Sequence, residues 1–268
     1  MSDEPEKRSG TLDVRIDKGI GWVILNNPNR LNSMSMSMWR AMDLGLRQFD
    51  HDDAVRCIVV TGAGSRAFCA GADISEFEQH RSERETNLEY DRVAKAAINR
   101  LQGMEKPTLA MISGYCIGGG VGLAISCDIR LGAAGSRYGI PAAKLGLGYD
   151  FPGLKRLVSL VGPSRAKQII FTAEQCNAEK ALRVGLIDEC VADAELEAAT
   201  LRLAAAIAGN APLTIAAAKY CADLATRIPI EADLAEARRR VELCFDSSDF
   251  VEGRRAFMEK RKPAFQGK

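Results

Sequence analysis

Two short glycine-rich stretches contain the residues whose types and spacing could do chemistry. The first is GYCIGGGVGLA at residues 114–124, with five glycines among its first nine residues, and the second is AFCAGADI at residues 67–74. A glycine inside a helix or strand costs stability relative to alanine, so such a cluster needs a backbone reason. The glycines either allow tight packing where a strand meets a helix or let main-chain N–H groups approach a ligand.

The N–H groups of such turns could stabilise a negatively charged oxygen. Each stretch follows an apolar run and leads into a helical pattern, so the N–H groups near Gly119 lie at the positive end of a helix. Two backbone donors that converge on one carbonyl oxygen form an oxyanion hole, which stabilises enolates and tetrahedral anions. A dinucleotide-binding GxGxxG motif is excluded, because Ile125 stands at the third glycine position counted from Gly120.

The elements that must position these turns follow from hydrophobic periodicity. Alternation over residues 12–16, followed by an apolar run at 20–25, predicts a hairpin, and apolar spacing over 38–49 predicts an amphipathic helix. Charged sequence over 75–104 predicts helix with a break near 79–86. Buried strands are predicted at residues 55–61, 107–113 and 127–133. Such alternating units predict an α/β fold with a mainly parallel sheet and helices packed outside.

Composition limits the classes of partner. The chain has 268 residues, 47% of them apolar and 26% charged, with a net charge of +1, as in an ordinary globular protein. Without a stripe of Lys and Arg, neither nucleic acid nor an anionic membrane is expected as a partner. The uncharged residues 107–126 are long enough to span a membrane, but a proline and five glycines favour a buried strand–turn–helix unit.

Cysteine and histidine usage argues against metal and disulfide sites. The eight cysteines form no CxxC pair and are expected to be reduced core residues of a cytoplasmic protein. His51 and His80 are the only histidines, and neither belongs to a zinc-binding pattern. Since GxSxG is absent as well, a Ser-His-Asp hydrolase is excluded. No metal is expected.

The chain divides into three parts by composition. Residues 1–10 are polar without the apolar run of a secretory signal, and a disordered tail is predicted there. Residues 11–192 form the α/β core, and residues 193–268 show only helical spacing, for example at Ile230, Leu234 and Val241. Because Ala-rich helices cannot bury both faces alone, this last part is expected to pack on a neighbouring subunit.

Several motifs together resemble one known family. The pair AFCAGADI and ISGYCIGGGVGLAISCDIRLGA is similar to the signature of the crotonase superfamily, the enoyl-CoA hydratase/isomerase family. NRLNSMS, YGIPAAKLGLG, AEKALRVGLIDECV and VEGRRAFMEKRKPAF extend the resemblance over nearly the whole chain. The resemblance implies a spiral of ββα repeats with a C-terminal helical trimerisation region, in a homo-trimer or a dimer of trimers. It also implies acyl-CoA substrates, with coenzyme A as part of the substrate and no other cofactor.

The resemblance also implies the positions of the site residues. The N–H groups of Ala70 and Gly119 would hold the thioester oxygen. Arg30 and Leu31 would contact the CoA nucleotide and Lys260 its phosphates, although a solvated surface charge remains the alternative for Arg30 and Lys260. The other expected substrate-binding residues are Gly71, Ala72, Asp73, Gly118, Gly122, Ala142 and Tyr149.

Two positions depart from the pattern of the family's hydratases. These hydratases carry two glutamates that act through one water, and Gly122 and Ala142 stand at those positions here. Neither residue can transfer a proton. A positioned acid or base contributes about 10²–10⁴-fold to a rate, so ordinary hydration should be crippled while thioester binding and enolate stabilisation survive.

Asp150 is the predicted replacement for the missing glutamates. It falls where the family's chlorobenzoyl-CoA dehalogenases carry a nucleophilic aspartate, and Tyr149 falls where naphthoate synthases carry an aspartate. The apolar neighbours Leu147 and Phe151 could desolvate the Asp150 carboxyl and raise its pKa. The alternative is that Asp150 caps the helix that begins near Pro152.

Other reactive side chains are expected to be structural, and two classes of function remain open. Asp73 and Asp128 are interpreted as a helix cap and a strand start, and Cys69 as a buried thiol. The first class is an acyl-CoA enzyme of the lyase/isomerase type. The second is a catalytically silent acyl-CoA-binding trimer. A different crotonase-type reaction, such as isomerisation, decarboxylation or hydrolysis using Asp150, is a further alternative.

Overall fold

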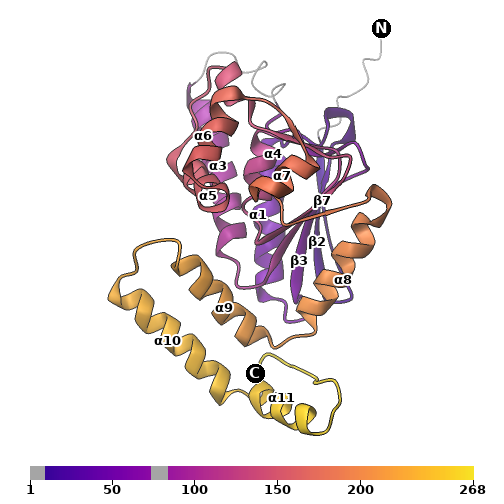
Figure 1. Cartoon of the computed structure of the whole chain (residues 1–268), viewed down its shortest axis with the longest axis vertical. Helices are drawn as coiled ribbons and strands as arrows, with labels where there is room; N and C mark the ends of the chain where they lie inside the picture. The colour runs from indigo at the N-terminus through magenta and orange to yellow at the C-terminus, as the bar shows by residue number, and fades with distance from the viewer. Residues whose placement is uncertain (1–9, 74–83) are drawn as a thin grey trace.

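The computed structural model describes residues 10–73 and 84–268 of the chain. The predicted tail up to residue 9, residues 79–83 of the predicted break and His80 lie outside the described residues. Figure 1 shows a mixed sheet–helix body from which a helical arm extends at the C-terminal end.

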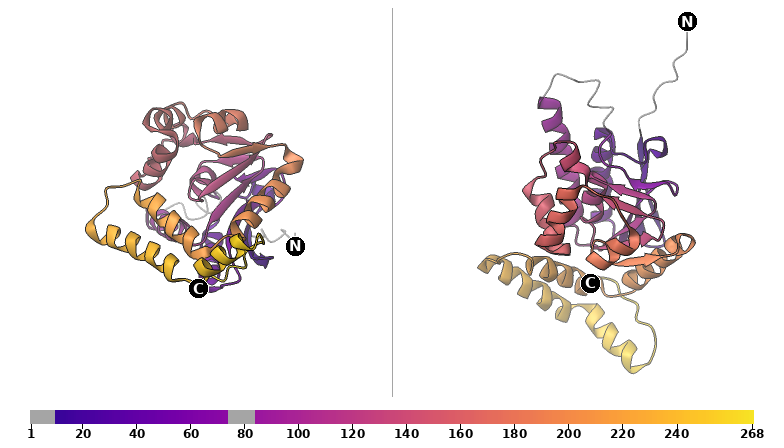
Figure 2. Two further views of the ribbon diagram at one scale, coloured as in Figure 1. Left: turned by 60° about the horizontal axis from the view of Figure 1, so that its bottom comes forward. Right: turned by 45° about the horizontal axis from the view of Figure 1, so that its top comes forward.

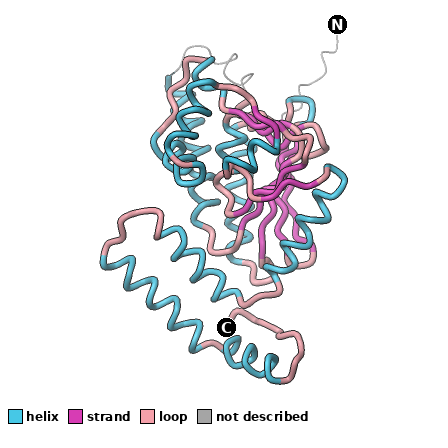
Figure 3. Tube along the Cα trace, in the orientation of Figure 1, coloured by secondary structure: helices cyan, strands magenta, loops and turns pink. Residues whose placement is uncertain are grey.

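A six-stranded sheet forms the centre of the body (Figure 3). The first two strands form the predicted antiparallel hairpin, and every later neighbour pairs in parallel. The strands in sheet order are β1 (Thr11–Asp17), β2 (Ile20–Asn26), β3 (Cys57–Gly62), β5 (Thr108–Ile112), β7 (Ile129–Ala133) and β10 (Glu189–Val191). The predicted buried strands and the parallel sheet are therefore confirmed.

A second sheet of four short strands lies at the ends of these strands. Its order is β4 (Ala67–Cys69), β6 (Tyr115–Ile117), β8 (Arg137–Gly139) and β9 (Cys176–Asn177). The strands β3 and β4, β5 and β6, and β7 and β8 follow one another in the chain, one in each sheet. A helix follows each pair, so three successive ββα units build the body.

Helices cover both faces of the large sheet. The described α-helices that precede residue 185 in the chain are α1 (Met36–His51), α3 (Arg84–Gly103), α4 (Gly119–Ala124), α5 (Phe151–Val161), α6 (Pro163–Thr172) and α7 (Ala178–Val184). α8 (Leu196–Ala208) lies on the face opposite α1 and α3 (Figure 1). Successive side chains of β3 point to opposite faces of the sheet. Ile58 and Val60 therefore join the main core, whereas Cys57 and Val59 pack with Ala204 of α8 on the other face. A sheet buried on both faces needs such continuous apolar runs.

The C-terminal arm consists of α9 (Pro212–Leu224), α10 (Glu231–Asp246) and α11 (Ser248–Met258). In Figures 1 and 2 these helices lie at one end of the body, and α10 packs along α9. The predicted division at residue 193 falls before α8, which packs on the sheet, so the arm begins one helix later.

The described helices are too short or too charged for membrane spans. No single helix among them is long and apolar enough to cross a membrane, and only one pair, Asp193–Ala208 with Pro212–Leu224, reaches that composition, bent by 106°. The uncharged residues 107–126 divide into β5, β6 and α4, as a strand–turn–helix unit requires.

Candidate active site

The two glycine-rich turns lie side by side. β4 and β6 are parallel neighbours in the four-stranded sheet, so the loops at their carboxyl ends meet at one edge. An ideal Cβ on Gly71 would lie 3.4 Å from the Gly119 nitrogen, and one on Gly119 would lie 3.4 Å from the Gly71 Cα. The two turns therefore face one another so closely that a methyl group on either glycine would contact the backbone of the other.

The structure corrects one of the two expected donors. The Ala70 N–H donates to the Leu31 carbonyl oxygen at 3.0 Å, so it is already engaged. In the same turn the Gly71 N–H lies 3.4 Å from the Cys69 Sγ, and the Asp73 N–H donates to the Met34 carbonyl at 2.9 Å. Ala70 is therefore not suited to hold a substrate oxygen.

Ala72, and not the expected Ala70, offers an unbonded N–H in this turn. Its nitrogen lies 3.8 Å from an ideal Cβ on Gly119, and its N–H makes no hydrogen bond to any residue in the described part of the chain. The N–H of Gly119, the first residue of α4, is likewise unbonded to the described residues. Two backbone donors without an internal acceptor thus stand on adjacent turns.

Two glycines of the cluster are required by this arrangement. Gly118 has a φ of 57° and a ψ of −116°, a conformation that favours glycine, and it directs the chain from β6 into α4. An ideal Cβ on Gly120 would lie 2.0 Å from the Cys69 carbonyl oxygen. Close packing and open N–H groups, the two reasons considered for the cluster, therefore occur together.

The loop before α1 supports the first turn. Arg30 donates to the Asp73 carboxylate at 2.7 Å, and Asp73 is buried. The Asn32 side chain donates to the Ala67 carbonyl at 2.7 Å, while Leu31 adopts a φ of 52° and presents the carbonyl that holds Ala70. Arg30 is thus part of the frame of the turn, and its contact with CoA stays a prediction, as does that of Leu31.

One of the two glutamate positions, Gly122, lies near a tyrosine. Ala142 is buried in a short 3-10 helix, Pro141–Lys144. Among the described residues outside α4, an ideal Cβ at position 122 would meet one atom within 4 Å, the Tyr149 hydroxyl at 3.9 Å. Burial raises the pKa of Tyr149 to about 12, with a further contribution from the Asp150 charge, so the phenol keeps its proton at neutral pH.

Asp150 has the capping role considered as its alternative. Its carboxylate accepts the Gly153 N–H at 3.2 Å as the N-cap of α5 and pairs with Lys95 at 3.1 Å. The predicted desolvation is not present, because the side chain is 44% exposed and both Leu147 and Phe151 point to solvent. The structure therefore favours a cap over proton chemistry at Asp150.

Lys260 does not join the turns within one chain, and the Cys69 thiol beside them is not reactive. Lys260 follows α11, which lies at the opposite end of the molecule from α4 in Figure 1. Burial raises the pKa of the Cys69 thiol to about 12, so it is a neutral core group. Within the described ranges, no three His, Cys, Asp or Glu side chains cluster as a metal site would require.

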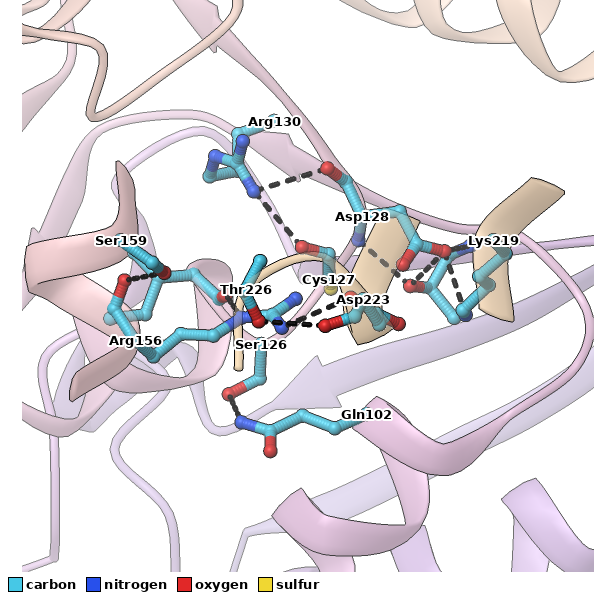
Figure 4. Close-up of polar contacts among 12 residues, drawn as sticks. Gln102, Ser126, Cys127, Asp128, Arg130, Arg156, Ser159, Lys219, Asp223 and Thr226 are labelled. Carbon is cyan, nitrogen blue, oxygen red and sulfur yellow. Dashed lines mark hydrogen bonds and ion pairs between the residues drawn. The ribbon is translucent and has the colours of Figure 1, made fainter. Parts of the chain in front are cut away.

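A polar network behind α4 joins the body to the arm (Figure 4). Asp128 accepts the N–H and the hydroxyl of Thr108 at 2.8 and 3.0 Å and the Lys219 ammonium of α9 at 2.8 Å. Arg156 donates to the Ile125 carbonyl at 2.7 Å, just after α4 ends. Asp128 is therefore structural, as expected.

Comparison with known proteins identifies the family. The profile of the enoyl-CoA hydratase/isomerase family matches residues 15–268. The short-chain-enoyl-CoA hydratase of Clostridium acetobutylicum is 35% identical over 240 residues, 90% of this chain and 91% of the relative. The crotonyl-CoA hydratase of Syntrophomonas wolfei is 33% identical over 246 residues, 92% of this chain and 94% of the relative.

A solved structure agrees in fold. The crystal structure of an enoyl-CoA hydratase/carnithine racemase from Magnetospirillum magneticum matches with a TM-score of 0.90 at 33% identity and covers 96% of both chains. The fold defines a mixed α/β protein that matches solved structures of this family. The chain belongs to the enoyl-CoA hydratase/isomerase family of the crotonase superfamily.

Proposed function

We propose that this protein is an acyl-CoA enzyme of the lyase/isomerase type that stabilises a thioester enolate between the N–H groups of Ala72 and Gly119. The observation that carries the proposal is the pair of unbonded donors on adjacent turns. When a thioester becomes an enolate, negative charge moves onto its oxygen. Donors fixed in place before the reaction stabilise that charge without reorganisation.

The first test removes one donor while preserving the turn. Proline lacks an N–H and is tolerated at the first helical position, which Gly119 occupies. We expect Gly119→Pro to lower kcat by about 10²–10³-fold, as for the loss of one oxyanion-hole donor. Gly119→Ala is the matched control, because it keeps the N–H and its Cβ would make only an ordinary 3.4 Å contact. Equal rates for both variants would refute the proposed hole.

The relatives are named hydratases, but this chain lacks the two glutamates that hydration needs in this family. Gly122 and Ala142 supply no acid or base, so we expect hydration of crotonyl-CoA by the natural sequence to be slow, with kcat/KM below about 10⁴ M⁻¹s⁻¹. The double variant Gly122→Glu with Ala142→Glu should hydrate faster, and the double glutamine variant should not. Rapid hydration by the natural sequence would contradict this expectation.

A catalytically silent acyl-CoA-binding protein is the second candidate, and the absence of both carboxylates favours it. Calorimetry with CoA thioesters, paired with turnover assays on enoyl, malonyl-type and β-keto thioesters, separates the two candidates. Binding without turnover of any thioester in that panel would support the silent protein.

We also propose that the protein forms a homo-trimer or a dimer of trimers. An apolar groove between α9, α10 and α11 is lined by Cys221, Val241, Phe245, Phe250, Phe257 and Phe265. Phe257 and Met258 are 83% and 80% exposed in the single chain. Apolar surfaces of this kind mark sites of protein association.

A further inference from the structure

We propose that the Tyr149 hydroxyl is the proton donor to the enolate, and that the substrates are malonyl-type thioesters, which form their enolate by losing CO2. This inference rests on the proposed function, because it places the proton donor beside the same oxyanion hole. The assignment of Tyr149 follows from the space that Gly122 leaves open.

The hydroxyl lies about as far from position 122 as a carboxylate there could reach. A glutamate carboxylate oxygen lies about 3.5 Å from its own Cβ, given bond lengths of about 1.5 Å. The Tyr149 oxygen lies 3.9 Å from the ideal Cβ of Gly122, and outside α4 no other atom of the described residues comes within 4 Å of that point. A phenol from the α5 side thus replaces a carboxylate from α4.

The ring of Tyr149 is held while its hydroxyl stays available. The side chain packs against the main core, and an ideal Cβ on Gly153 would lie 3.1 Å from the ring Cε1. The Asp150 cap fixes the adjacent backbone at the start of α5. Among the residues that the structure describes, none hydrogen-bonds to the Tyr149 hydroxyl, and the atom is not fully enclosed.

Among the described residues around the turns, the protonation states favour a donor over a base. A neutral phenol can give a proton but cannot take one. Asp150 is committed to its cap and to Lys95, Asp73 pairs with Arg30, and the Cys69 thiol is buried and neutral. Hydration and isomerisation both need a base, whereas decarboxylation forms the enolate without one.

The proposed step balances with the groups present. The bond between the α-carbon and the carboxylate breaks, CO2 leaves, and the electron pair enters the thioester enolate, whose oxygen the Ala72 and Gly119 N–H groups hold. The O–H bond of Tyr149 then breaks as a C–H bond forms at the α-carbon. The resulting phenolate recovers a proton from water. No oxidant or reductant takes part.

The test uses malonyl-CoA and methylmalonyl-CoA with the full-length chain. We expect the natural sequence to release CO2 from at least one of them, and Tyr149→Phe to lower kcat by about 10²-fold or more, as for the loss of a general acid. Calorimetric Kd values should stay unchanged. Tyr115→Phe is the matched control, because Tyr115 is exposed at the start of β6 and should leave both quantities unaltered.

A stereochemical measurement separates proton donation from a structural role. In D2O the natural sequence should convert methylmalonyl-CoA into one enantiomer of α-deuterated propionyl-CoA, whereas Tyr149→Phe should give a mixture because solvent then delivers the deuteron to both faces. Thioester binding without CO2 release, or a Tyr149→Phe variant that keeps rate and enantiomer, overturns the inference and leaves the oxyanion hole standing. No binding of any CoA thioester overturns both proposals.

Discussion

The two glycine-rich turns and the C-terminal arm differ in how completely one chain can bury them. At the turns the backbone itself is packed, and Phe68, Cys69 and Leu123 have no exposed surface. In the arm, Phe245 and Phe257 are mostly exposed although both belong to helices. The turns can therefore reach their final geometry within one chain, whereas the apolar surface of the arm stays exposed and is available for the proposed contact between subunits.

A few polar contacts join the arm to the body that contains the turns. Lys219 of α9 reaches Asp128 and the Lys106 carbonyl, and Arg240 of α10 pairs with Glu105 at 2.7 Å. These contacts anchor the near side of the arm to the body and leave α11 outside it. The comparison indicates that substitutions at the turns act on folding and catalysis, and that substitutions on the outer arm act on assembly.

The largest effect is expected at Gly120. Its Cβ position lies 2.0 Å from a backbone oxygen that no rotamer change can move, so Gly120→Ala must displace β4 or α4. We expect a loss of about 3 kcal/mol or more in the free energy of unfolding, which corresponds to a fall of about 10 °C in Tm. Thermal unfolding followed by circular dichroism measures it.

Gly122 provides the control within the same helix. Among the described residues outside α4, only the Tyr149 hydroxyl comes near its Cβ position, at 3.9 Å, so alanine should stabilise α4 by up to about 1 kcal/mol. Similar Tm values for Gly120→Ala and Gly122→Ala would show that the turns are not packed as described.

A smaller effect, on assembly alone, is expected in the arm. Phe257→Asp places a charge on the proposed contact surface, and burial of one phenylalanine side chain contributes about 1.5–3 kcal/mol. Self-association should weaken by about 10–100-fold in Kd per interface, as measured by analytical ultracentrifugation. Leu44→Asp, on an exposed face of α1 outside the arm, should leave assembly unchanged. If both variants dissociate, or neither does, the arm is not the contact surface that distinguishes it from the body.

Elements with strong periodicity could be predicted, and very short ones could not. The apolar spacing over α1 and the β-branched run of β3 gave the right elements, because many residues share one burial pattern. The strands β6, β8 and β9 have three, three and two residues, too few to show an alternation. The second sheet that brings the turns together was therefore absent from the sequence prediction.

The sequence analysis predicted which two turns form the candidate site, but not which N–H group and which side chain face it. Ala70 and Ala72 are alike in sequence, and only the distant Leu31 carbonyl decides which N–H remains open. Asp150 and Tyr149 are neighbours, yet one side chain faces Lys95 and solvent while the other approaches Gly122. Such orientations depend on tertiary contacts that local patterns do not encode.

The smallest expected effect concerns one ion pair in each region. Asp43 of α1 pairs with Arg47 at 3.0 Å and with Arg100 of α3, so it joins two helices of the body. Glu236 pairs with Arg239 and Arg240, all within α10 of the arm. Burial alone would raise the pKa of Asp43, but the hydrogen bonds from both arginines outweigh it and lower the pKa.

Asp43→Asn should therefore cost about 1 kcal/mol of stability at pH 7, as for one charge-assisted hydrogen-bonded contact. Because the folded-state pKa lies below the ordinary value of 3.8, this contribution is present above that pH and is lost as the pH falls through the folded-state pKa. Urea unfolding should give the same difference at pH 7 and pH 5, and the two curves should converge only at pH values below 3.8. Glu236→Gln should change stability little at any pH, because Arg239 is exposed and both partners lie on the helix of Glu236 itself. An equal, pH-dependent loss in both variants would mean that the arm is as firmly packed as the body.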